Sequence, residues 1–141
     1  MASEELRAIE LLGRVPYGRL ATSRRALPIL AVARHVVTED QVLLRLHRGL
    51  GHHESCDGTV IAYGADNFNT AADRGDDPWS VQFTGPAEIA HPCPEQQELF
   101  GPAPLTANGE PFDPVYLRLE PHFVTLHTLG FHATQRTGHT E

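Results

Sequence analysis

The segment LHRGLGHHESCDG, residues 46–58, gathers side chains that could bind an anion. Arg45, the residue just before this segment, and His47 stand two residues apart in a strand-like run, so both side chains leave the strand on the same face. Arg48 follows, and two glycines within the next three residues allow the backbone to turn tightly or to approach a ligand closely. A guanidinium makes planar, charge-assisted hydrogen bonds that suit phosphate oxygens. The pattern therefore predicts an anion site, most naturally for a phosphate.

The paired histidines of the same segment predict a short helix. It would begin at His52, run toward Cys56 and end near Gly58. Free backbone N–H groups at its N-terminus would then lie beside the arginines and add to the anion site. The alternative is an exposed polar loop without a ligand. The spacing matches neither a Walker loop nor a dinucleotide fingerprint.

Other kinds of site find less support in the sequence. His52 and Cys56 would share a helix face, but zinc usually takes four well-spaced ligands and no CxxC or HExxH pair is present, so we expect no metal site. All 11 basic residues are arginines, which excludes a lysine Schiff base. No GxSxG nucleophile motif occurs. Haem would need only one axial histidine, and none of the nine histidines is marked for that role.

Composition limits the class of protein. A chain of 141 residues with 40% hydrophobic and 21% charged residues is expected to form one domain, residues 1–141. The net charge of −7 argues against a nucleic-acid partner. No apolar run reaches membrane-spanning length, the N-terminus does not look like a signal peptide, and two cysteines make no disulfide framework. We therefore expect a cytoplasmic protein with no membrane partner.

The expected elements are mostly strands. Helical spacing covers residues 1–13, and alternating or β-branched runs cover 18–23, 27–37, 42–47, 59–65, 79–90 and 115–129, the last interrupted at Pro121. Residues 66–77 are expected to be a polar connection, a short helix to run from Pro94 through Phe100, and 101–111 to be a loop. The tail, 132–141, is expected to be disordered. Six strands joined mostly by short turns predict a mainly β protein, an antiparallel barrel with a few short helices.

Three segments in order carry a resemblance to a known family. They are LLGRVPYGRLATS, HRGLGHHESCDGTVIAYGADNF and WSVQFTGPAEI. Together they resemble the pyridoxamine 5'-phosphate oxidase-like flavoproteins, and most closely the small branch that includes nitroimidazole-resistance proteins. The resemblance implies a six-stranded antiparallel split β-barrel that forms a homodimer and binds FMN between the subunits.

The same resemblance suggests which residues hold the cofactor. In the family a basic residue at a strand end and a lysine after a glycine turn hold the FMN phosphate. Here Arg45, His47 and Arg48 occupy the strand end, and His52 stands near the position of the lysine. Because an imidazole is largely neutral at physiological pH, this replacement predicts weaker or pH-dependent binding.

Two residues of the third segment are further candidates. Trp79, the single tryptophan, is implied to lie near the flavin or at the dimer seam; the alternative is a core aromatic on an alternating strand. Gln82, on the opposite face, would hydrogen-bond the ring edge or else be solvated.

The resemblance supports two hypotheses of different classes. The first is an FMN-dependent oxidoreductase that transfers hydride between a small organic substrate and the flavin, with NAD(P)H as a candidate partner. The second is a non-catalytic split-barrel module that holds haem or another planar ligand, or that has no ligand.

Overall fold

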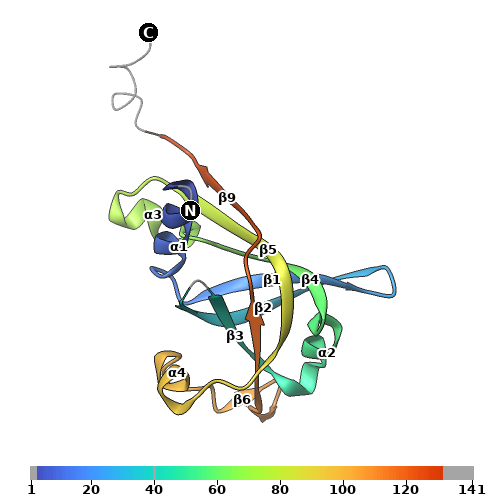
Figure 1. The fold of residues 1–141 in the computed structure, drawn as a ribbon. Helices are drawn as coiled ribbons and strands as arrows, with labels where there is room; N and C mark the ends of the chain where they lie inside the picture. Colours follow the sequence, from blue (N-terminus) through green and yellow to red (C-terminus); the bar gives the residue numbers. More distant parts are fainter. Residues whose placement is uncertain (1–2, 40, 132–141) are drawn as a thin grey trace.

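Six strands close into an antiparallel barrel (Figure 1). The computed structural model describes residues 3–39 and 41–131. Hydrogen-bonded neighbours follow the order β4-β1-β2-β3-β8-β5, and β5 pairs back onto β4 to complete the barrel. The six strands are β1 (Tyr17–Arg24), β2 (Leu27–Thr38), β3 (Gln41–His47), β4 (Thr59–Asp66), β5 (Trp79–Ala90) and β8 (Pro114–Leu119). The predicted fold class, a mainly β six-stranded antiparallel barrel, is confirmed.

The long strand expected at 115–129 is two strands, which pair with different halves of β5. Its first part, β8, pairs with the second half of β5, whereas β9 (Phe123–Thr128) pairs with the first half. The change occurs around Pro121, where the chain passes very close to β5. A Cβ atom on Gly85 would lie 1.9 Å from the backbone oxygen of Glu120, so only glycine fits at this crossing.

Short helices fill the connections. They are α1 (Ser3–Leu12), the 3-10 helix η1 (Arg48–Leu50), α2 (His52–Cys56), α3 (Phe68–Arg74) and α4 (Pro94–Leu99). α1, α2 and α4 lie where the sequence predicts them, although α1 begins at Ser3 and the expected tail, 132–141, lies outside the described residues.

The expectation of a polar connection over 66–77 is wrong, because α3 occupies its centre. The Asp66 carboxylate accepts a hydrogen bond from the Phe68 N–H at 2.9 Å at the start of the helix, and Gly75 ends it in the left-handed conformation. Only Ala71 of this helix is buried, so it has almost no apolar periodicity by which to be recognised.

Residues 101–111 are also more regular than a loop. Within them β6 (Thr106–Ala107) and β7 (Glu110–Pro111) form a two-stranded hairpin. Its turn, Asn108-Gly109, has positive φ at both residues, the geometry that Asn-Gly favours. We call residues 101–113 the strap, because they pass across the end of β3.

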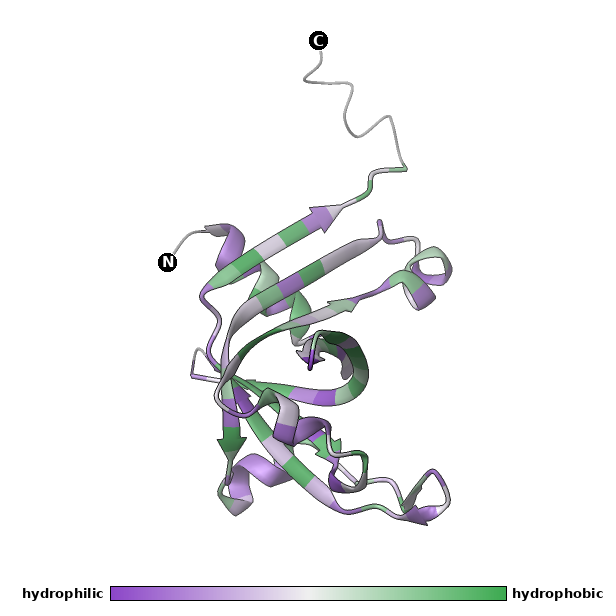
Figure 2. Ribbon diagram, turned by 90° about the vertical axis from the view of Figure 1, so that its right-hand side faces the viewer, coloured by the Kyte–Doolittle hydropathy of each residue, from purple (hydrophilic) through white to green (hydrophobic). Residues whose placement is uncertain are grey.

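The main core lies inside the barrel, and a buried histidine, His35, joins helix α1 to it through hydrogen bonds. Apolar and polar residues alternate along the strands, as Figure 2 shows. His35 is 2% exposed. Its Nδ1 lies 2.5 Å from the Tyr63 hydroxyl and its Nε2 lies 2.9 Å from the Leu12 carbonyl, so this residue fastens the end of α1 to the barrel.

No helix among residues 3–39 and 41–131 has the length and apolarity needed to cross a membrane.

Candidate anion-binding site

β3 is buried on both of its faces. Every residue from Val42 to His47 is buried, although only one face of the strand lines the barrel interior. The outer face carries Leu43, Arg45 and His47. Leu43 packs in a second apolar cluster with Phe100, at the end of α4, and the strap covers the two polar residues. The alternation predicted for β3 therefore places Arg45 and His47 on one face, but beneath the strap.

Arg45 is held by the start of the strap. Its side chain is 5% exposed, and its two terminal nitrogens donate to the carbonyl oxygens of Gly101 and Pro102 at 3.2 and 3.4 Å. The guanidinium also lies over the rings of Phe100 and Phe112, at 5.3 and 5.9 Å from their centroids. Among the described residues, this buried cation is thus satisfied by neutral carbonyls and aromatic faces, without a carboxylate.

His47 is held by the end of the strap. The Asp113 N–H donates to Nδ1 at 3.1 Å, and Nε2 lies 3.3 Å from Oε1 of Glu110. Because Nδ1 accepts a hydrogen bond, the ring proton is on Nε2, which donates to Glu110. The imidazole stacks on Phe112 at 5.5 Å between centroids and is 6% exposed.

A cavity of about 200 Å³ lies beside these two side chains. Arg45 and His47 line it together with Leu50 of η1 and with Tyr17 and Val32 from the first two strands. The lining thus combines two buried polar groups with apolar and aromatic walls. Such a combination suits a ligand with an anionic group and an apolar body.

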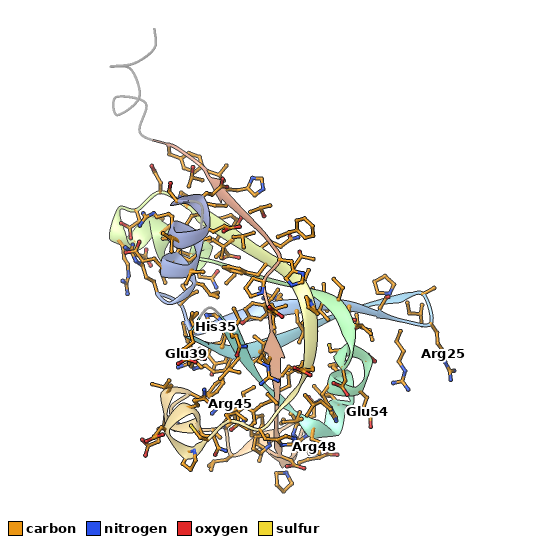
Figure 3. All side chains as sticks on the ribbon, in the orientation of Figure 1. Arg25, His35, Glu39, Arg45, Arg48 and Glu54 are labelled. Carbon is orange, nitrogen blue, oxygen red and sulfur yellow. The ribbon has the colours of Figure 1, made fainter. Side chains whose placement is uncertain are left out.

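Arg48 and His52 lie more openly. The Arg48 N–H donates to the Asp113 carbonyl at 2.7 Å, and its Nε lies 3.5 Å from an Asp113 carboxylate oxygen, with both side chains more than half exposed. Figure 3 shows Arg45 and Arg48 toward the same end of the barrel, away from α1. His52, at the start of α2, is half-buried.

The neighbouring His53 is a candidate that sequence reasoning missed. It is 5% exposed, and its Nδ1 is buried with no hydrogen-bond partner in the described part of the chain. Buried polar groups nearly always have a partner, so an orphaned imidazole nitrogen one residue after the candidate His52 calls for an explanation. The sequence marks His52 and His53 equally; only the rotation of α2 against the barrel separates them.

Cys56, the other inward residue of α2, is not a reactive group. Burial raises the pKa of its thiol to about 11, although a hydrogen bond with Thr22 acts in the opposite direction. The thiol is therefore protonated and poorly nucleophilic.

Trp79 and Gln82 do not line the cavity at Arg45 and His47. Trp79 belongs to the main core, as the structural alternative predicted, and its N–H donates to the Asn67 side chain at 2.8 Å. Gln82 is exposed on the outer face of β5, in a shallow hollow shared with Arg19 and His127. These two residues are therefore separate from the cluster on β3.

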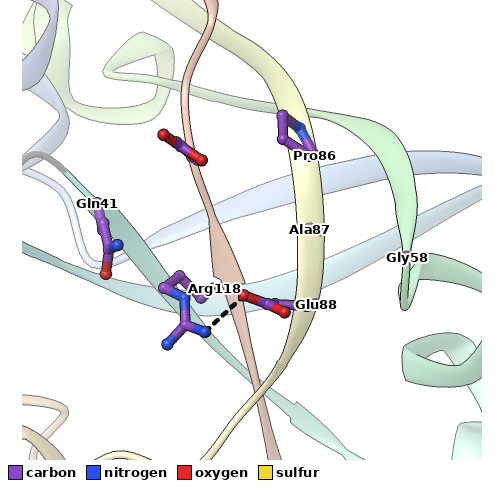
Figure 4. A pocket seen from close by; sticks show the side chains of 7 residues that line it. Gln41, Gly58, Pro86, Ala87, Glu88 and Arg118 are labelled. Carbon is purple, nitrogen blue, oxygen red and sulfur yellow. Dashed lines mark hydrogen bonds and ion pairs between the residues drawn. The ribbon is translucent and has the colours of Figure 1, made fainter.

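A larger hollow lies elsewhere on the barrel, with a volume of about 480 Å³ (Figure 4). Its one cation, Arg118, is already paired with Glu88 at 2.6 Å, and Glu120 adds a second carboxylate. None of the six predicted site residues lines it.

Two of the three buried histidines in the described residues are poor candidates for a haem ligand, whereas Nδ1 of the third, His53, is unpartnered. His35 and His47 use both ring nitrogens in hydrogen bonds, so neither offers a free nitrogen to an iron. Residues 3–39 and 41–131 contain no group of three His, Cys, Asp or Glu side chains placed to hold a metal ion.

Comparison with known proteins agrees with this architecture. Residues 4–128 match the family model described as pyridoxamine 5'-phosphate oxidase. A curated relative, the uncharacterized protein Rv0080 of Mycobacterium tuberculosis, is 34% identical over 91 residues, which are 60% of this chain and 58% of the relative. The match thus spans less than two thirds of that relative's length.

Solved structures share the fold at low identity. An FAD-binding protein from Mycobacterium smegmatis superposes with a TM-score of 0.67 at 19% identity, covering 89% of this chain and 96% of that one. A putative pyridoxamine 5'-phosphate oxidase from Corynebacterium glutamicum gives 0.64 at 22% identity, covering 91% and 92%. An FAD- and haem-binding protein from M. smegmatis gives 0.64 at 12% identity, covering 99% and 80%.

Proposed function

Because the chain belongs to the pyridoxamine 5'-phosphate oxidase family, we propose that it binds a flavin nucleotide and serves as a flavin-dependent oxidoreductase. The observation that carries the proposal is the pair Arg45 and His47, both more than nine-tenths buried beside one cavity at the end of β3. Burying an arginine is costly unless its charge is used or compensated, and a phosphate would use it more fully than two carbonyls do.

The residues at the end of β3 and in the segment that follows fit a phosphate group in kind, and of them Arg45 and His47 line the cavity. Arg45 and Arg48 supply guanidinium donors that keep their charge at any physiological pH. His47, His52 and His53 supply imidazoles that become donors on both nitrogens when protonated. The unpartnered Nδ1 of His53 supports the fit, because a bound anion would satisfy a nitrogen that the fold leaves alone.

The protein's part in the chemistry is binding, orientation and the exclusion of water. A bound flavin would supply the hydride acceptor or donor. The arginines would anchor its phosphate, and the apolar walls formed by Tyr17, Val32 and Leu50 would keep water from the ligand body. A place near the ring or at a dimer seam stays a proposal for Gln82, which is exposed on β5, and for Trp79, which packs in the main core. A small organic substrate and NAD(P)H are the proposed partners of the reaction, in the cytoplasm.

We also propose that the working unit is a homodimer. Tyr17, Leu30, Val32 and Leu50 are exposed large apolar residues beside the cavity or along β2. Covering them with a second copy would remove apolar surface from water and close the open side of the site. Sedimentation at micromolar concentration tests this point: a dimer supports the proposal, and a monomer in the presence of flavin contradicts it.

The second candidate is a non-catalytic module for haem or another planar ligand. It is supported by the similar fold of the M. smegmatis protein that binds FAD and haem. The absorption spectrum of the purified protein separates the two: flavin bands support the first candidate, and a Soret band supports the second.

The decisive experiment measures the contribution of the phosphate. We would titrate the protein with FMN, FAD and riboflavin, and repeat this with Arg45→Ala, Arg48→Ala and, as a control of equal charge, Arg74→Ala on α3. Each of the first two substitutions should weaken FMN binding by about 1.5–3 kcal/mol, the range for charged hydrogen bonds, and leave riboflavin nearly unaffected. Equal losses for both ligands would mean damage to the fold, and no binding of any flavin would refute the proposal.

A further inference from the structure

The strap presents its own negative charges to two polar side chains of the candidate site, the imidazole of His47 and the guanidinium of Arg48. Glu110 lies 3.3 Å from His47, and Asp113 lies 3.5 Å from Arg48. Both carboxylates come from one short segment, and both meet residues that are proposed to hold a phosphate. The strap therefore occupies the positions that an anionic ligand would need.

We propose that Glu110 and Asp113 are built-in competitors for the anion, so that a phosphate binds only by displacing the strap carboxylates from His47 and Arg48. The inference rests on the proposed function and names a means of regulating that same site. The affinity measured for an anion is then its affinity for the open state, reduced by the fraction of molecules in which the strap is open.

The contacts of the strap make this exchange feasible. Most strap residues are exposed, including Glu110 at 68% and Leu105 at 90%, and Phe112 is its main apolar anchor. The remaining links to β3 and η1 are polar: the carbonyls on Arg45, the Glu110 and Asp113 contacts, and the Arg48 N–H bond. A segment with few buried apolar contacts opens at low free-energy cost.

Because Gly49 has no side chain, the Glu110 carboxylate has room to contact His47. A Cβ atom at this position would lie 2.6 Å from Nε2 of His47 and 2.9 Å from Oε1 of Glu110. The contact between the imidazole and the carboxylate thus depends on the missing side chain of a neighbouring residue. In the closed state of the strap, Gly49, His47 and Glu110 therefore pack closely together at the end of β3.

The test replaces each strap carboxylate by the amide of the same shape, which removes its negative charge. In Glu110→Gln the amide oxygen still accepts a hydrogen bond from His47, so a purely structural role would survive the change. Asp113→Asn does the same at Arg48. Glu98→Gln, at an exposed position on α4 outside the strap, gives the same change in net charge and serves as the control.

Each strap substitution should tighten FMN binding about threefold, because it removes a negative charge that competes with the phosphate. At Asp113 it also breaks an exposed ion pair, which contributes less than about 1 kcal/mol, and this loss favours the open state. Riboflavin affinity and the Glu98→Gln control should not change. If wild type binds FMN and both strap variants bind it equally well, the competition is refuted while the proposed function stands.

A second measurement does not require flavin. The Asp113 and Arg48 amides are both hydrogen-bonded through the closed strap, so their hydrogen exchange reports its opening. Exchange at Asp113 should be faster in Glu110→Gln than in wild type without any ligand, and inorganic phosphate should accelerate it in wild type. If no flavin binds, these two results alone decide the inference: both effects support it, and the absence of either overturns it.

Discussion

Two buried histidines show how a structural imidazole differs from a candidate ligand. His35 and His53 are 2% and 5% exposed, so burial does not separate them. His35 has a partner for each ring nitrogen, whereas Nδ1 of His53 has none within the described chain. The fold fully accounts for the first residue and leaves the second with an unsatisfied donor or acceptor. A buried histidine is therefore a candidate ligand-binding residue when one of its ring nitrogens lacks a hydrogen-bond partner, and burial alone does not identify it.

The largest effect on stability is expected from replacing His35, the histidine whose two ring nitrogens both have partners. His35→Ala would leave the Tyr63 hydroxyl and the Leu12 carbonyl without their partner and would open a cavity in the core, so we expect a loss of about 3 kcal/mol in the free energy of unfolding. Urea denaturation measures this. A loss below about 1 kcal/mol would show that the junction of α1 with the barrel contributes little.

Tyr63→Phe is the matched control for that prediction. It removes one hydroxyl and leaves Nδ1 of His35 unpartnered, which puts His35 in the condition of His53. The hydroxyl also donates to the Ala33 carbonyl at 3.2 Å, so that contact is lost as well. The expected loss is still smaller, about 1–2 kcal/mol, because one hydroxyl is removed and little volume is lost.

Much of the fold follows from local pattern. The six strands of the barrel were predictable because each has an alternating or β-branched run bounded by turn residues, and α4 because Pro94 opens it. Helix α3 was missed because it buries one alanine and shows no apolar stripe. The hairpin inside the strap was missed because β6 and β7 have two residues each, too few for any periodicity.

The site was predictable only in part, for a different reason. Alternation along β3 correctly puts Arg45 and His47 on one face. Their partners, at 101–113, lie more than fifty positions away in the sequence, and no local pattern links the two segments. Likewise, only tertiary packing decides that His53, and not His52, turns inward.

The second prediction concerns the titration of His35. Burial, assisted by the nearby Arg34 charge, lowers the pKa of His35 below its usual value of 6.5, against the opposing effect of hydrogen bonds with the Leu12 and Val15 backbone. The unfolded chain therefore takes up the proton first as the pH falls. The contribution of His35 to stability is present above pH 6.5 and is lost below it, at up to about 1.4 kcal/mol per pH unit.

The measurement compares urea midpoints at several pH values between about 5 and 8, the window around the ordinary histidine pKa. His35→Gln lacks the titrating ring and should show a shallower loss on the acid side, since the other titrating groups remain in both proteins. Parallel curves for wild type and variant would contradict the assigned pKa shift.

The smallest effect concerns His53 and has the opposite sign. His53→Leu removes a buried nitrogen that has no partner and keeps a side chain of similar size, so the free energy of unfolding should rise by about 1 kcal/mol. His52→Leu, one residue away and half-buried, should change stability by less than about 0.5 kcal/mol. The same His53→Leu protein should bind FMN more weakly, because the lost nitrogen is the one that a phosphate would satisfy. Thermal unfolding and FMN titration test the two effects separately. A protein that gains stability without losing affinity would remove His53 from the site, whereas a loss of stability would mean that its imidazole has a partner and belongs with His35.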